Sequence, residues 1–135
     1  MAKMGKATLS FTSESAGPGG SIWVLRPKGQ VQTETADRLE SEFQGPAVRA
    51  AKRVLVDLTE VDYVSSAGWG LFIAQLRTQR ERAGDLRLCA LRAPVREIFE
   101  MLQFQSVLQS YPGRDEAIAS WGDEPDAPRG RKGLH

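Results

Sequence analysis

The sequence predicts a single α/β domain built on a mixed, mostly parallel β-sheet of four to five strands with about four α-helices. Three observations support this fold class. Strand-like and helix-like segments alternate along most of the chain, which is typical of parallel strands connected by helices. The nearly continuous apolar run at residues 53–58 suits a central strand covered on both faces. The turn sequence at residues 17–20 separates two strand-like segments and predicts an opening hairpin.

The first half of the chain supplies that hairpin, one helix and the central strand. Residues 7–11 alternate loosely in polarity, and residues 22–25 are apolar with β-branched and aromatic members, so both segments are predicted strands. The second strand is expected to end at residues 27–29, where proline and glycine occur. Residues 33–44 carry apolar side chains at spacings of three and four, which predicts a helix closed by the Gly-Pro pair at residues 45–46.

The second half of the chain continues the alternation. Apolar spacing predicts a helix over residues 67–83, with Gly84 as its C-terminal cap. Pro94 suits the first position of a further helix, because the N–H that proline lacks would have no intrahelical partner there. The remaining predicted elements are a strand over residues 86–90, a short strand at residues 107–108 and a short helix over residues 115–121.

The composition is that of one folded domain with nearly balanced charge. The 135 residues include 18 Lys and Arg against 17 Asp and Glu, which gives a formal net charge of +1. This balance argues against direct nucleic-acid binding, which needs a basic surface. Residues 1–6 are expected to be a flexible N-terminus, residues 7–121 the domain, and residues 122–135 a disordered tail of mixed charge.

Cysteine usage and hydropathy indicate where such a chain would work. The lone cysteine, Cys89, cannot form an internal disulfide, which favours a reducing, cytoplasmic location. A buried, inert thiol is the favoured role of Cys89, and a reactive thiol is the alternative. No secretory signal is visible near the start, and no apolar run is long enough to insert into a membrane.

Conventional catalytic and metal-binding chemistry has little support in this sequence. The single histidine, His135, is the last residue, which leaves none inside the domain for a metal site or for a serine or cysteine triad. Asp57 ends a predicted strand and could suggest a carboxylate catalyst, but no partner acid or base stands at a readable spacing, so a structural role is favoured. We therefore expect no enzyme activity, no cofactor and no bound metal.

Residues 57–68 are the most informative segment. They run from the carboxyl end of the central strand to the start of the next predicted helix, where ligands and reactive groups gather in open α/β sheets. Ser65 and Ser66 stand at that helix start. Serine is a preferred N-cap residue, so capping alone is one explanation. The other is phosphorylation, because a phosphate there would meet free backbone N–H groups and the positive end of the helix dipole.

The same segment resembles the signature of the STAS family, the domain shared by sulfate transporters and anti-sigma factor antagonists. The family pattern runs from Asp-Leu at a strand end, through a hydrophobic and aromatic stretch, to Asp-Ser-Ser/Thr-Gly and an amphipathic helix. The matching positions are Asp57-Leu58, Val61, Tyr63-Val64, Ser66, Gly68 and Gly70. Matches in kind and spacing continue at Gly84, residues 86–90, Ala93-Pro94-Val95, Ile98-Phe99 and Tyr111-Pro112, so the resemblance covers residues 7–121.

Residue-by-residue comparison with that motif places Ser66 at the phosphorylated serine of the antagonists. Ser65 takes the place of the family's aspartate and is the alternative phosphate acceptor. Ala67 takes the second hydroxyl position. Asp62 is the nearby acid that could compensate for the missing carboxylate.

The resemblance implies an anti-sigma factor antagonist that acts by partner switching. In that mechanism the unphosphorylated domain binds an anti-sigma factor that is also a serine kinase, and so frees a sigma factor. Phosphorylation of Ser66 ends the complex, and a serine phosphatase restores binding. The domain is then a monomer or weak homodimer that serves as substrate and binding module in stress-response transcription control.

Two other functions stay open. The first is a non-switching STAS subunit or scaffold of a stress-signalling assembly or of a lipid-transport ATPase complex. The second is a small enzyme or nucleotide-binding protein, which is the least supported because no glycine-rich phosphate loop precedes a helix.

Residues around the two serines form the expected partner surface. Trp69 and Leu71 each have two explanations, because an apolar residue there can be core or a binding anchor. Thr33 and Glu34 start the first predicted helix, which in the family lies beside the switch loop, so they are expected either to cap that helix or to contact the partner. The complete expected set is Asp62, Tyr63, Ser65, Ser66, Ala67, Gly68, Trp69, Leu71, Thr33 and Glu34.

Overall fold

A computed structural model describes residues 8–122 of the chain. Within these residues it contains six strands, five α-helices and two 3-10 turns, and it confirms the α/β class with a mixed sheet. Residues 1–6 and 123–135, which belong to the predicted flexible ends, lie outside the described residues. The elements are β1 (Leu9–Ala16), η1 (Pro18–Gly20), β2 (Ile22–Val31), α1 (Thr33–Phe43), α2 (Pro46–Ala50), β3 (Arg53–Asp57), β4 (Glu60–Val64), α3 (Ser66–Glu81), β5 (Asp85–Cys89), α4 (Ala93–Met101), η2 (Phe104–Ser106), β6 (Ser110–Tyr111) and α5 (Arg114–Ala119).

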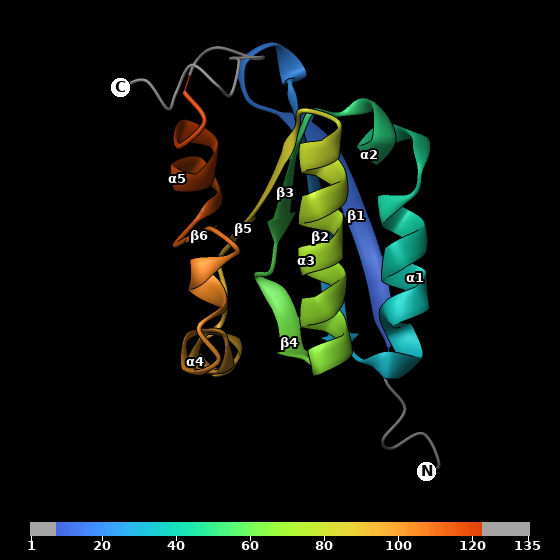
Figure 1. Cartoon of the computed structure of the whole chain (residues 1–135), viewed down its shortest axis with the longest axis vertical. Helices are drawn as coiled ribbons and strands as arrows, with labels where there is room; N and C mark the ends of the chain where they lie inside the picture. The colour runs from blue at the N-terminus through green and yellow to red at the C-terminus, as the bar shows by residue number, and fades with distance from the viewer. Residues whose placement is uncertain (1–7, 123–135) are drawn as a thin grey trace.

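The sheet brings the starts of two helices together. Its strands follow the order β1-β2-β3-β5-β6, and β4 pairs with β2 (Figure 1). β1 and β2 form the predicted antiparallel hairpin, and the remaining pairs are parallel. Val31 at the end of β2 pairs with Val64 at the end of β4. Because α1 follows β2 and α3 follows β4, the first turns of both helices lie at the same edge of the sheet.

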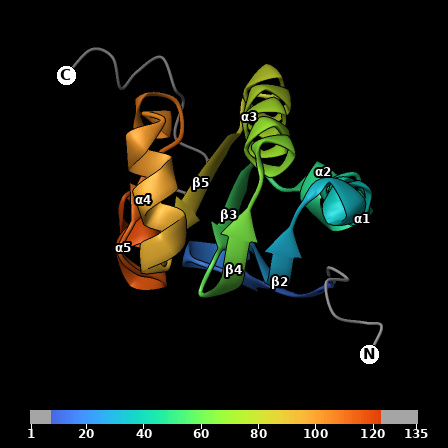
Figure 2. The same cartoon turned by 90° about the horizontal axis from the view of Figure 1, so that it is seen from below.

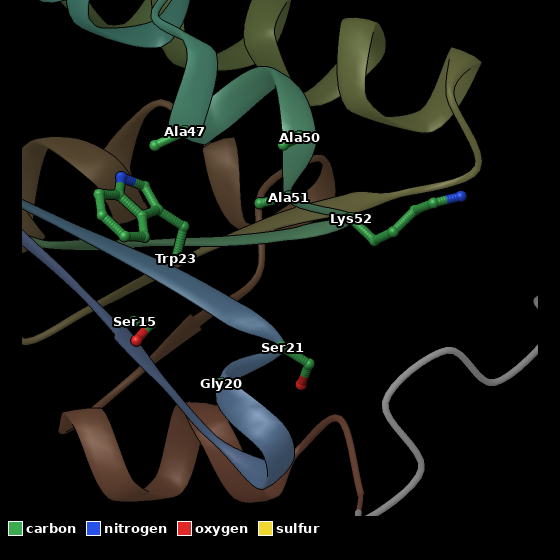
Figure 3. Close-up of a pocket in the computed structure, with 8 residues that line it drawn as sticks. All are labelled: Ser15, Gly20, Ser21, Trp23, Ala47, Ala50, Ala51 and Lys52. Atoms are coloured by element: carbon green, nitrogen blue, oxygen red, sulfur yellow. The ribbon is translucent and has the colours of Figure 1, made fainter.

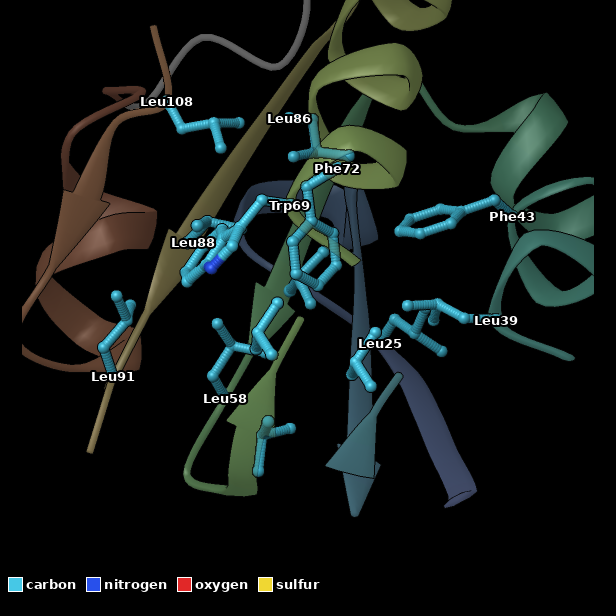
Figure 4. Packing of buried hydrophobic residues seen from close by; sticks show 14 of the residues in the cluster. Leu25, Leu39, Phe43, Leu58, Trp69, Phe72, Leu86, Leu88, Leu91 and Leu108 are labelled. Carbon is cyan, nitrogen blue, oxygen red and sulfur yellow. The ribbon is translucent and has the colours of Figure 1, made fainter. Parts of the chain in front are cut away.

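Two apolar clusters hold the layers together. The main core lies between one face of the sheet and helices α1 to α4 (Figure 2). Its largest side chains, Trp69, Phe72 and Phe43, point from α3 and α1 into this space (Figure 4). A smaller cluster lies on the other face, where Ala117 of α5 covers Val24 and other strand residues. The elements that carry the serine pair are therefore anchored in the main core.

Strand β2 is longer than predicted. Pro27 and its neighbours are expected to end this strand, yet it continues to Val31. β3 pairs with β2 as far as Leu25, and β4 pairs with it from Lys28 onward. Pro27 sits in the gap between these two parallel partners, where the N–H that it lacks is not needed for a ladder. The extension of β2 is what creates a docking edge for β4.

Two elements of the structure, β4 and α2, were not predicted from the sequence. β4 lies inside residues 57–68, where the alternation is broken because Asp62 and Tyr63 are both exposed between buried Val61 and Val64. α2 begins at Pro46, which occupies the first turn of a new helix in addition to following the previous one. A short segment that lacks clear periodicity is the kind of element that pattern reading misses.

The last strand also differs from the prediction. Pairing with β5 occurs at Ser110 and Tyr111, whereas residues 107–108 are the predicted strand. Leu108 is completely buried in the main core, so its apolar character reflects packing rather than strand pairing. Residues 107–108 therefore belong to the connection between η2 and β6.

Candidate functional site

Asp57, at the end of β3, fixes the turn that leads into β4. One of its carboxylate oxygens accepts hydrogen bonds from the Thr59 backbone N–H, at 3.0 Å, and from the Thr59 hydroxyl. The other accepts a hydrogen bond from Nη2 of Arg114 at 3.2 Å. Burial alone would raise the pKa of Asp57, but these hydrogen bonds and the Arg114 charge hold that pKa below its usual value. The interactions match the favoured structural role of Asp57.

Ser65 and Ser66 differ in their surroundings at the start of α3. Ser65 is the N-cap of α3, and its Oγ accepts a hydrogen bond from the Gly68 backbone N–H at 3.3 Å. The Ser65 backbone N–H donates to the Val31 carbonyl at 2.8 Å, which ties the helix start to β2. Ser66 is the first residue inside the helix and is exposed, as is Ala67. The capping serine is thus half-buried and engaged, and the next serine is accessible.

The first turn of α3 favours an added negative charge. It carries no acidic side chain, and its backbone N–H groups point away from the helix body. The aligned peptide dipoles give this end of the 16-residue helix a partial positive charge. A phosphate on Ser66 would therefore meet a favourable field without breaking the helix.

Gly68 allows the helix to approach the sheet closely. A Cβ atom at this position would lie 2.7 Å from Cγ1 of Val31 and 2.8 Å from Cγ1 of Val64. Those two valines are the paired last residues of β2 and β4. Gly68 is buried, so its contribution to the site is the position of the helix start rather than a surface for a partner.

The structure corrects the placement of Trp69 in the partner surface. Only 1% of Trp69 is exposed, and its indole packs among Phe72, Phe99 and Phe104. Figure 4 shows Trp69 next to Phe72 in the core. The core explanation for Trp69 therefore holds, because α4 and η2 cover the face that a partner would need. Leu71 is half-buried and packs against the same core.

Asp62 does not compensate for the missing family aspartate at the helix start. Its carboxylate is paired with Nη1 of Arg92 at 2.9 Å, and both side chains are about half exposed. Ser65 supplies the helix cap instead. The pair links the outer side of β4 to the residue that precedes α4, a contact that sequence spacing does not reveal because the two residues are 30 positions apart.

Thr33 and Glu34 lie beside the serine region. Neither residue caps α1, because the capping hydrogen bond runs from the Gln32 backbone N–H to the Thr35 hydroxyl. Both are exposed in the first turn of α1. Together with Gln32, Tyr63 and Ser65 they line an open hollow of about 410 Å³. Tyr63 is 49% exposed, so this aromatic side chain is available to a partner. Gln32 is absent from the predicted set; its position immediately before the first predicted helix is the signal that could have included it.

A hollow of similar size lies at the opposite end of β2. About 420 Å³ in volume, it is lined by Trp23, the alanines of α2 and polar residues near η1 (Figure 3). In that view the Lys52 side chain points away from the indole of Trp23. Trp23 is near the start of β2, whereas Ser65 is hydrogen-bonded to the last residue of β2, Val31. The hollow beside Trp23 is therefore separate from the serine region.

Residues 8–122 contain neither a candidate metal cluster nor a helix that could span a membrane. Within that range no cluster of three or more His, Cys, Asp or Glu side chains could hold a metal ion. Over the same range no helix is long and apolar enough to cross a membrane. Cys89 is buried, and burial together with the nearby Asp57 charge raises the pKa of its thiol to about 12.

The described residues form a small α/β domain, and comparison with known proteins assigns its family. The chain belongs to the STAS domain family, whose model matches residues 19–117. It is 34% identical over 94 residues to BtrV of Bordetella bronchiseptica, which is named as an anti-sigma factor antagonist. That match covers 70% of this chain and 81% of BtrV.

Solved structures agree with the fold. An anti-sigma factor antagonist from Thermotoga maritima superposes with a TM-score of 0.72 at 15% identity, covering 82% of this chain and 92% of that chain. Unphosphorylated SpoIIAA superposes with a TM-score of 0.64 at 20% identity, covering 83% of this chain and 96% of that chain. SpoIIAA from Bacillus in its phosphorylated form gives a TM-score of 0.61 at 17% identity, covering 83% of this chain and 99% of that chain.

Proposed function

We propose that this chain is an anti-sigma factor antagonist that acts by partner switching, with Ser66 as the phosphorylated residue. In this proposal the unphosphorylated domain binds an anti-sigma factor that is also a serine kinase. Phosphorylation of Ser66 ends the complex, and a serine phosphatase restores it. One observation at the start of α3 carries the proposal. Ser65 caps the helix, and the next residue, Ser66, is exposed.

The family membership supports the proposed activity. The relative BtrV carries the name of an anti-sigma factor antagonist, and SpoIIAA, which shares the fold, has been solved in phosphorylated and unphosphorylated forms. A chain of this kind is a substrate and binding module rather than an enzyme. We place its action in the cytoplasm and assign the function to residues 7–121.

The replacement of the family aspartate by Ser65 is compatible with a working switch. A serine hydroxyl and an aspartate carboxylate both accept a hydrogen bond from the third residue of a helix, and Ser65 makes this bond to Gly68. Because the Ser65 Oγ is engaged in capping, its modification would cost the helix a cap. Ser66 has no such role, which favours it over Ser65 as the phosphate acceptor.

Phosphorylation of Ser66 would oppose binding through charge. A phosphoserine adds about −1.5 to −2 charges at neutral pH. Glu34 already lines the hollow beside the helix start. A partner surface that complements this acid would have to desolvate and accommodate a further dianion. A loss of about 2.7 kcal/mol in this contact already weakens binding about a hundredfold.

Mass spectrometry and affinity measurements test the proposal together. The protein is captured from its source cells, and the Ser65-Ser66 peptide and the co-purifying proteins are identified. The co-purifying kinase is then expressed and used to phosphorylate the wild type, Ser66→Ala and Ser65→Ala. We expect loss of phosphate uptake in Ser66→Ala, retention in Ser65→Ala, and loss of kinase binding in Ser66→Asp.

Other outcomes favour the alternatives. Phosphate on Ser65 alone would move the modification to the capping residue. A persistently unmodified peptide that co-purifies with a transport ATPase or a large scaffold would indicate a non-switching subunit, and Ser66→Asp would then bind normally.

A further inference from the structure

The exposed large apolar side chains of the described residues lie on β4, on α4 and in the segment that follows α4. They are Tyr63 on β4, Ile98 and Met101 on α4, and Leu102 and Val107 in the segment that follows α4. Met101 is 69% exposed and Leu102 is 54% exposed, although isolated exposure of this size would need no explanation by itself. Their concentration in one part of the fold does need an explanation.

Helical spacing places three of these side chains on one flank of α4. Ile98, Met101 and Leu102 stand at positions i, i+3 and i+4, and the Leu102 N–H donates to the Ile98 carbonyl at 2.9 Å. Val95 and Phe99, on the adjoining side of the helix, are buried in the core. The apolar stripe of α4 is thus wider than the core requires, and its outer part faces solvent.

This flank belongs to the end of the molecule that carries Ser66. α4 packs against β4, and Figure 2 shows β4 running directly into the start of α3. The ion pair between Asp62 and Arg92 joins β4 to the start of α4 on the surface. In the core, the contacts of Trp69 with Phe99 and Phe104 join α3 to α4 and η2. α4 therefore adjoins β4, the strand that carries Tyr63 and leads to Ser66.

We propose that the outer flank of α4, formed by Ile98, Met101 and Leu102, is a second part of the contact with the anti-sigma factor. This inference rests on the proposed function. The partner would present an apolar surface to the flank, while Glu34, Thr33 and Ser66 supply polar recognition. Apolar anchors, with methionine enriched among them, surrounded by a polar rim are the usual anatomy of such a contact.

The size of the flank favours a larger partner surface over a second copy meeting through α4. α4 has nine residues and is therefore about 14 Å long. A stable complex buries about 800 Å² on each partner, more than one short helix flank offers. Joined to β4 and to the first turns of α3 and α1, the flank becomes part of a surface of suitable extent for one partner.

The test compares binding of matched variants to the anti-sigma factor kinase recovered above, in purified form. Met101→Glu combined with Leu102→Glu places two charges on the flank, and Ala119→Glu places one on an exposed position of α5, which covers the other face of the sheet. We expect the double variant to bind at least about tenfold more weakly by titration calorimetry, with Ala119→Glu unchanged. Thermal unfolding monitored by circular dichroism checks that each variant is folded. If the double variant does not fold, the binding of the single variant Met101→Glu is measured instead.

The remaining outcomes separate this inference from the proposed function. Unchanged affinity in the folded flank variants, together with loss of binding in Ser66→Asp, overturns the α4 contact and leaves the switch intact. Weak binding by the flank variants with normal binding by Ser66→Asp supports the contact and contradicts the switch. Sedimentation velocity that shows a wild-type dimer abolished by Met101→Glu overturns the inference in favour of a second copy.

Discussion

The indole of Trp69 lies nearly parallel to the ring of Phe104, with the ring centroids 5.2 Å apart and the planes at 28°. The ring centroid of Phe99 lies 5.5 Å from that of the same indole. The residue that follows the Ser66-Ala67-Gly68 turn is therefore held from inside the protein by α4 and η2. This contact fixes the position of the exposed serine through the packing of a buried neighbour.

Substitution of Trp69 is expected to affect stability much more than partner recognition. Trp69→Ala would remove a large buried side chain and lower the free energy of unfolding by about 3–5 kcal/mol. Trp69→Phe should cost clearly less, because the buried indole Nε1 has no hydrogen-bond partner within the described residues. Urea denaturation measures both values. A folded Trp69→Phe variant that loses partner binding would show that the indole itself contacts the partner.

The two serines are expected to contribute differently to stability. Ser65→Ala should lower the free energy of unfolding by about 1 kcal/mol, because it removes the cap that accepts from Gly68. Ser65→Asp should retain stability, since aspartate is an equally good cap. Ser66→Ala should change the free energy by less than about 0.5 kcal/mol. Chemical denaturation of the unphosphorylated variants tests this order, and equal costs at both positions would contradict it.

Two glycines of α3 make a matched pair of substitutions. Gly68→Ala should destabilise the domain by about 1–3 kcal/mol, because the added Cβ would meet the side chains of Val31 and Val64. Gly70→Ala places a Cβ in open space on the same helix and should stabilise it by about 0.5–1 kcal/mol. Thermal unfolding measures whether each variant is less or more stable than the wild type. A neutral Gly68→Ala would mean that the helix start can move away from the sheet.

The Asp57 carboxylate is expected to make stability depend on acid pH. Its folded-state pKa is lowered, so it stabilises the fold above its unfolded pKa of about 3.9, and this contribution is lost as the pH falls through the lower folded value. Asp57→Asn should therefore be less stable than the wild type at pH 7, and the difference should shrink below about pH 4. Urea denaturation at several pH values measures it. A difference that stays constant down to pH 2 would rule out this titration.

Cys89 is expected to be unreactive in the folded protein. Its thiol is buried and its pKa is about 12, so almost no thiolate is present at neutral pH. A chromogenic disulfide reagent should leave the native protein unmodified at pH 8 and should titrate one thiol in urea. Rapid labelling without urea would indicate local opening of β5.

The fold class follows from local patterns, and so does the location of the serine pair. The apolar run of β3 and the helical spacing in α1, α3 and α4 each depend on a few consecutive residues, so single-sequence reading finds them. β4 and α2 escape it because each has five residues and no clear period. The register that pairs Val31 with Val64 is a long-range property, which is why Glu34 and Ser65 can be assigned to one hollow only from the structure.

By itself, the sequence determines that this protein is an α/β domain of the STAS type with two serines at the start of an amphipathic helix. Periodicity, turn residues and the family motif carry that information along the chain. The tertiary structure decides that Ser65 is the cap and Ser66 is exposed, and that Trp69 is buried while Tyr63 is accessible. Those distinctions depend on how β2, β4 and α4 pack around the helix start, and packing between distant segments leaves no periodic trace in the chain.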